Sequence, residues 1–161
     1  MTPTVIDTNV LVVANGGQNQ ASEECQLACV NALLQARRGR VLIDSLGLIL
    51  KEYGDNVCFY QPPLAGSEFY RWLCNHLGQE SCRAVDITPT GDSFAEFPDD
   101  PDLAGFDRSD HKFVAVARAS GLAPPILNSV DTDWWIHRQA LDRNDIHIEF
   151  LCPEAMRARG V

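Results

Sequence analysis

Five acidic residues stand where their carboxylates could together bind a divalent cation: Asp7, Glu52, Asp110, Asp131 and Asp133. Carboxylate oxygens are the ligands that hard cations such as Mg²⁺ and Mn²⁺ prefer, and these ions keep several bound waters. One or two such ions can activate a water molecule and stabilise a leaving oxygen. The residue types therefore predict hydrolysis of a phosphodiester bond with Mg²⁺ or Mn²⁺ as cofactor.

Such a site requires separate elements of secondary structure that bring the carboxylates together. Short apolar or β-branched runs predict strands at residues 4–6, 41–44, 84–87, 125–128 and 146–150. The segments between them predict helices at residues 23–38, 46 to about 59, 66–76, 109–120 and 134–141. Because strands alternate with helices, we expect an α/β protein. Its predicted form is a three-layer α/β/α sandwich around a mostly parallel sheet of about five strands.

The acids occupy informative places on this scaffold. Asp7 ends the first strand, and Asp131 and Asp133 follow the strand at residues 125–128. Asp110 lies in the first turn of the helix before that strand, and Glu52 lies inside an apolar helix. In parallel sheets, ligands bind beyond the carboxyl ends of the strands. We therefore expect these carboxylates to meet at one edge of the sheet.

Four segments in this order resemble the PIN-domain nuclease family. Residues 5–11 (VIDTNVL) resemble its opening Asp-Thr-Asn signature, and residues 50–53 (LKEY) resemble its helical glutamate. Residues 106–117 resemble its third acid at the start of a helix of small residues, and residues 127–134 resemble its final acidic segment. The four segments span nearly the whole chain, so the resemblance implies a single PIN-like domain over residues 1–161.

The resemblance implies a metal-dependent endonuclease that cuts single-stranded RNA. The metal ligands it implies are Asp7, Asp110 and Asp131, with Glu52 bound directly or through water and Asp133 as an auxiliary acid. Many small bacterial members of this family are toxins of toxin–antitoxin pairs. An antitoxin protein and a second copy of the chain are therefore partners to consider beside RNA.

The resemblance also assigns two orienting residues. Asn9 would orient Asp7, and Ser129 would orient the site through its hydroxyl, which replaces the threonine common in the family. Trp134 replaces the usual phenylalanine and keeps an aromatic anchor. Asp107 competes with Asp110 for the third acidic position, but Asp110 begins the helical apolar stripe and is preferred.

Two other classes of function fit parts of this pattern. The first is a catalytically inactive PIN-like binding module that acts through a protein partner, and the intact acids count against it. The second is a phosphotransfer domain. A haloacid-dehalogenase phosphatase would need a second aspartate where Asn9 stands, and a signalling receiver would need a lysine that residues 146–151 do not contain.

Composition limits the remaining alternatives. The net charge of −9 argues against a protein that coats nucleic acid through positive charge. Bound cations would offset clustered carboxylates, so a metal site is compatible with this charge. The chain begins without a basic leader, and the apolar run at residues 10–14 is too short to span a bilayer. We therefore expect a cytoplasmic protein without a membrane segment.

Three further expectations concern packing. The helix at residues 23–38 should be capped by Ser22 and bury Leu27, Val30, Leu33 and Leu34. Residues 88–105, rich in Pro, Asp and Gly, should form a solvated, mobile loop. The cysteines form no metal-binding or disulfide framework, so we expect free thiols that pack as small hydrophobic groups. They are Cys25, Cys29, Cys58, Cys74, Cys82 and Cys152.

Overall fold

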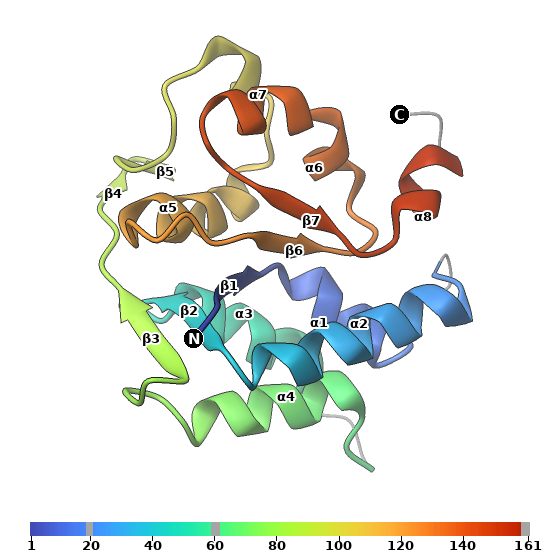
Figure 1. The fold of residues 1–161 in the computed structure, drawn as a ribbon. Helices are drawn as coiled ribbons and strands as arrows, with labels where there is room; N and C mark the ends of the chain where they lie inside the picture. Colours follow the sequence, from blue (N-terminus) through green and yellow to red (C-terminus); the bar gives the residue numbers. More distant parts are fainter. Residues whose placement is uncertain (19–20, 59–61, 159–161) are drawn as a thin grey trace.

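A five-stranded parallel sheet forms the centre of the computed structural model, which describes residues 1–18, 21–58 and 62–158. Its strand order is β3–β2–β1–β6–β7 (Figure 1). The strands are β1 (Pro3–Ile6), β2 (Arg40–Asp44), β3 (Cys82–Val85), β6 (Ile126–Asn128) and β7 (Ile148–Phe150). Every neighbouring pair in this sheet is parallel. The predicted fold class is confirmed, and the sheet is wholly rather than mostly parallel.

Helices cover both faces of the sheet. On one side, α1 (Thr8–Ala14), α2 (Glu23–Ala36), α3 (Leu48–Val57) and α4 (Ala65–Cys74) pack against one another (Figure 1). On the other side, α5 (His111–Ala119) crosses β1, β2 and β6, and α6 (Thr132–Ile136) leads into α7 (Arg138–Arg143) beside β7. A last helix, α8 (Pro153–Ala158), follows β7. No helix among the described residues is both long enough and apolar enough to cross a membrane.

The strand order reverses at β1, and this reversal positions the acidic residues. The chain runs outward from β1 through β2 to β3, then returns to the opposite side of β1 as β6 and β7. Val5 of β1 is paired with Ile126 of β6, so the carboxyl ends of these strands lie side by side. Asp7 follows the first strand directly, and Ser129 follows the other. In doubly wound sheets, such a switch point is where ligands bind.

The helix caps agree with the sequence in part. The Ser22 hydroxyl accepts the Cys25 backbone N–H at 3.1 Å, which confirms the predicted cap of α2. The helix after β2 is capped by Asp44, whose carboxylate accepts the N–H groups of Leu48 and Ile49 at 2.9 and 2.8 Å. The Asp44 carboxylate at the strand end therefore supplies the cap, because the N-cap residue Gly47 has no side chain to do so.

Several expected element boundaries differ. The third strand lies at Cys82–Val85 rather than 84–87, and the helix expected at 134–141 is two helices that meet at His137. The expected end of the second helix near residue 59 lies outside the described residues. In α2, Leu27 and Leu34 are exposed, and the buried face carries Cys25, Cys29, Leu33 and Ala36. The prediction is therefore confirmed for Leu33 and for Val30, which packs against the core, and wrong for Leu27 and Leu34.

The segment at residues 88–105 lies mostly at the surface, as expected, but it contains short elements of secondary structure. It forms a short hairpin of β4 (Pro89–Thr90) and β5 (Ser93–Phe94), followed by the 3₁₀ turn η1 (Pro101–Leu103). Leu103 is buried in the core. Arg143 of α7 lies 2.8 and 2.9 Å from Asp100 and Asp102. Two of the acidic residues that suggested a loop, Asp100 and Asp102, therefore form ion pairs with Arg143.

A disulfide joins Cys25 of α2 to Cys152, which follows β7. This overturns the expectation that all six cysteines are free thiols. The two residues are 127 positions apart in the sequence, so their spacing gives no sign of the pairing. The remaining cysteines, Cys29, Cys58, Cys74 and Cys82, are free.

Candidate metal centre

Three carboxylates meet beyond the carboxyl ends of β1 and β6. Asp7, Asp110 and Asp131 each offer one carboxylate oxygen, and these oxygens all lie within 4.8 Å of one another. Asp7 is the N-cap of α1, and Asp131 is the N-cap of α6. Asp110 ends the 3₁₀ turn η2 (Arg108–Asp110) that leads into α5. Three elements far apart in the sequence thus deliver one acid each, as predicted.

Hydrogen bonds fix the orientation of two of these acids. The Asn9 backbone N–H donates to Asp7 Oδ1 at 3.1 Å, and the Trp134 indole N–H donates to Asp7 Oδ2. The Asp133 backbone N–H donates to Asp131 Oδ1 at 3.0 Å. The first turns of α1 and α6 therefore aim these carboxylates. Asp7 is only 4% exposed, so its orientation is set by protein groups rather than by solvent.

Asp110 has an oxygen that the protein does not satisfy. Its Oδ2 atom is buried and has no hydrogen-bond partner among the described residues. Burial raises the pKa of Asp110 to about 10, and the charges of Asp7 and Asp131, together with a side-chain hydrogen bond to Asp131, add to this effect. An unpaired buried carboxylate is costly, because nothing replaces its lost hydration. A cation between the three acids would supply the missing partner.

Asp7 shows a related perturbation. Burial raises the pKa of Asp7 to about 7; the Asn9 backbone hydrogen bond opposes this rise, and the charge of Asp131 adds to it. Carboxylates gathered in a buried place disfavour their own ionisation unless a positive charge joins them. The donor set is all oxygen, which suits Mg²⁺ or Mn²⁺ rather than a soft metal. The three acids therefore fit the predicted cofactor.

Glu52 lies outside the group of three. Its carboxylate accepts a hydrogen bond from the Thr8 hydroxyl and is 2.9 Å from the Lys112 ammonium. Lys112 is only 8% exposed, and a lysine buried to this extent needs a charged partner, which Glu52 provides. The charge of Glu52 still acts on Asp7 and raises its pKa. Glu52 thus lies near the site, and its ligation of metal stays a prediction.

The carboxylate of Asp133 contacts groups outside the cluster of three acids. Its Oδ2 accepts the Asp107 backbone N–H at 2.8 Å, and its Oδ1 lies 3.2 Å from His137 Nδ1. Asp107 in turn accepts hydrogen bonds from the backbone N–H and hydroxyl of Ser109. The structure thus places Asp110 rather than Asp107 in the cluster of three acids. Asp133 forms a hydrogen bond with the Asp107 backbone beside this cluster. The auxiliary metal role of Asp133 stays a prediction.

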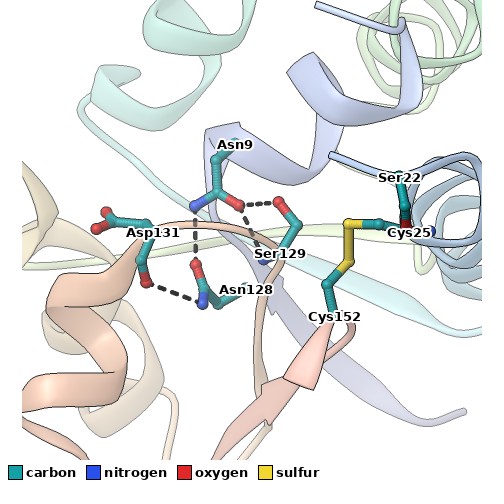
Figure 2. Close-up of a disulfide and its surroundings, with 7 residues drawn as sticks. All are labelled: Asn9, Ser22, Cys25, Asn128, Ser129, Asp131 and Cys152. Atoms are coloured by element: carbon teal, nitrogen blue, oxygen red, sulfur yellow. Dashed lines mark hydrogen bonds between the residues drawn. A yellow bond between two sulfur atoms is a disulfide. The ribbon is translucent and has the colours of Figure 1, made fainter. Parts of the chain in front are cut away.

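Asn9 bridges the ends of β1 and β6 (Figure 2). Its side-chain amide donates to Asn128 Oδ1 at 2.9 Å, and its Oδ1 accepts the Ser129 backbone N–H at 2.8 Å and also the Ser129 hydroxyl. Asn128 donates to the backbone oxygen of Asp131 at 3.1 Å. Asn9 and Ser129 therefore lie where the resemblance placed them, and they join the segments that carry Asp7 and Asp131.

The contacts of three residues around these acids were not predicted from the sequence: those of Thr8, Lys112 and Trp134. Trp134 was interpreted only as an aromatic anchor, yet its N–H is bonded to Asp7. A buried indole N–H needs an acceptor, and the neighbouring acidic segment was a usable signal for this contact. Thr8 and Lys112 gave no comparable signal, because their partner Glu52 is 44 and 60 residues away.

Comparison of the chain with protein-family models, with curated proteins and with solved structures finds no match.

Proposed function

We propose that this chain is a divalent-metal-dependent endoribonuclease that hydrolyses phosphodiester bonds of single-stranded RNA. The observation that supports it best is the convergence of Asp7, Asp110 and Asp131 at the switch point of a parallel sheet. The unpartnered buried oxygen of Asp110 strengthens the proposal, because a structural carboxylate would be expected to have a donor. The choice of RNA rests on the resemblance of the four acidic segments to PIN-domain nucleases.

Asp7, Asp110 and Asp131 would hold the cation. A bound Mg²⁺ or Mn²⁺ supplies Lewis acidity that activates water and stabilises the leaving oxygen. The chain's own groups keep the ligands aimed: Asn9 and Trp134 hold Asp7, and the start of α6 holds Asp131. Because hydrogen bonds from the protein aim these ligands, the site is preorganised for an ion, which reduces the cost of binding.

A hollow beside Glu52 offers a place for the substrate backbone. It has a volume of about 370 Å³, and its lining includes Lys51, Arg108 and Lys112. Lys51 and Arg108 form exposed ion pairs with Asp55 and Asp92, each at 2.7 Å. Exposed ion pairs contribute about 0–1 kcal/mol, so a phosphate can replace the acid partner at little cost. These two cations are therefore suited to contact RNA phosphates.

The proposal is tested by RNA cleavage with the purified protein. A fluorescent single-stranded RNA of mixed sequence is incubated with chelator-stripped protein, with and without Mg²⁺ or Mn²⁺. We expect cleavage only with the ion, and we expect Asp7→Asn to lower the rate by more than about a hundredfold. Loss of groups that merely support a ligand already costs 10–100-fold. The expected products are shorter internal fragments rather than single nucleotides.

Asp142→Asn is the matched control, because Asp142 is an exposed acid on α7. It should cleave like the wild type. Equal cleavage by Asp7→Asn would trace the activity to a contaminating nuclease and would overturn the proposal. An absence of cleavage with either ion would favour a binding module that acts through a protein partner.

A further inference from the structure

Three sulfur atoms gather between α2 and the segment after β7. Cys25 and Cys152 form the disulfide, and Cys29 is a free thiol. One Sγ atom of each residue lies within 4.8 Å of the others. Cys25 and Cys29 are four residues apart on one helix, so they project from the same face. Cys152 therefore has two cysteines within reach, one helical turn apart.

The disulfide and the third thiol differ in their access to solvent. A hollow of about 800 Å³ is lined by both disulfide residues, together with Glu23, Glu24 and Glu154. Cys29 is fully buried behind it. Burial raises the pKa of Cys29 to about 12, an effect that a hydrogen bond with Ser129 partly opposes. Because the thiolate is the attacking species, the Cys25–Cys152 pairing persists until Cys29 loses its proton.

We propose that this disulfide is exchangeable, with Cys29 as its alternative partner for Cys152. In the exchange, the Cys29 sulfur gives up its proton and attacks the Cys152 sulfur. A Cys29–Cys152 bond forms, the Cys25–Cys152 bond breaks, and Cys25 leaves as a thiolate that takes up a proton. One disulfide and one thiol are present before and after the step, so no external oxidant or reductant is required.

The exchange would reach the metal centre through Ser129. Ser129 lies beside Cys29 and lowers the pKa of its thiol. The Ser129 hydroxyl also donates to Asn9, the bridge between β1 and β6 (Figure 2). A Cys29–Cys152 bond would draw the Cys29 sulfur towards Cys152 and so change its contact with Ser129. The coupling to metal binding rests on the proposed function, whereas the exchange itself rests only on the three sulfurs.

The pairing is tested first in Cys25→Ser. The air-purified protein is alkylated while denatured, without reductant, and is digested with chymotrypsin for mass spectrometry. We expect a Cys29–Cys152 cross-link, with Cys58, Cys74 and Cys82 alkylated. Alkylation of both Cys29 and Cys152 in a folded protein would overturn the proposal, with folding checked by circular dichroism.

A second measurement uses the wild-type chain, so that the test does not depend on the variant's folding. The protein is partly reduced with a small dithiol, reoxidised, quenched with acid and digested. Chymotrypsin can cleave after Leu27, which separates Cys25 from Cys29 in the peptide map. Recovery of both pairings to Cys152 supports the exchange, and recovery of the Cys25–Cys152 pairing alone overturns it.

The coupling is measured by Mn²⁺ affinity in the two locked forms. Cys29→Ser can hold only the Cys25–Cys152 bond, and Cys25→Ser only the Cys29–Cys152 bond. We expect Mn²⁺ to bind about tenfold more weakly to Cys25→Ser, the size of effect seen when groups behind metal ligands change. Equal affinities would overturn the coupling. No Mn²⁺ binding by the wild type would instead overturn the proposed function, while the peptide maps still decide the exchange.

Discussion

Replacing Asp110 with asparagine is expected to stabilise the metal-free protein while removing the proposed RNA cleavage. The buried Oδ2 of Asp110 has no hydrogen-bond partner within the described part of the chain, and the nearby charges of Asp7 and Asp131 oppose its ionisation. Asparagine is neutral and can donate to those acids. We expect a gain on the order of 2 kcal/mol near neutral pH, because the folded wild type must keep Asp110 protonated at a pH where the unfolded chain ionises it, whereas the amide has no proton to keep. Loss of a metal ligand should at the same time lower cleavage more than about a hundredfold.

The stability gain should depend on pH in a defined direction. The pKa of Asp110 is raised from 3.8 to about 10 in the folded protein. Between these values the unfolded chain has lost its proton while the folded protein keeps it, so stability falls as pH rises. The amide of the Asp110→Asn variant does not titrate. The two proteins should therefore melt at similar temperatures near pH 4, and the variant should melt increasingly higher towards pH 9.

Differential scanning calorimetry of chelator-stripped protein across this range measures the effect. For a chain of this size, 2 kcal/mol corresponds to about 4–8 °C in Tm. Asp142→Asn again serves as control and should follow the wild-type curve, because its carboxyl group is exposed. A variant that is less stable than the wild type at every pH would mean that Asp110 has a donor and a purely structural role.

Replacing Cys152 with serine is expected to give the largest loss of stability. The disulfide closes a loop of 127 residues between α2 and the end of the sheet. Cross-links of long loops restrict the unfolded chain most, and removing a native disulfide typically costs about 2–5 kcal/mol. For this chain the Tm should fall by roughly 5–15 °C. Urea unfolding monitored by tryptophan fluorescence measures the loss in the free energy of unfolding independently.

Two comparisons make this result specific. Cys58 is exposed and free, so Cys58→Ser should leave the free energy of unfolding unchanged. Cys25→Ser should lose less stability than Cys152→Ser, because Cys29 can take over the pairing. If Cys152→Ser unfolds at the same urea concentration as the wild type, the disulfide does not contribute to the fold as described.

The parts of the structure that follow local patterns were predictable from sequence. Alternating strands and helices imply a parallel sheet, and that sheet places Asp7 and the residues after β6 at one edge. Asp110 was identified as the third acid because it begins an apolar helical stripe, and the structure places it in the cluster. These inferences required only the positions of residues along their own elements.

The features that were missed depend on the directions and partners of side chains. Glu52 and Lys112 form a pair across 60 residues, which no local pattern reveals. The Cys25–Cys152 bond likewise joins residues that are far apart in the sequence. In α2, cysteine and alanine occupy much of the buried face, while Leu27 is exposed. Hydrophobic size alone therefore gave the wrong prediction for Leu27. The acids at residues 88–105 suggested a loop because their contact with Arg143 was not visible in sequence.

The proposed function depends above all on Asp7, Asp110 and Asp131 forming a cation site. Titration of chelator-stripped protein with Mn²⁺, with the free ion followed by electron paramagnetic resonance, measures this directly. We predict that the wild type and Asp142→Asn remove Mn²⁺ from solution equally. Asp110→Asn and Asp131→Asn should bind it at least about tenfold more weakly. A free Mn²⁺ signal that is the same with and without the wild-type protein would contradict the account.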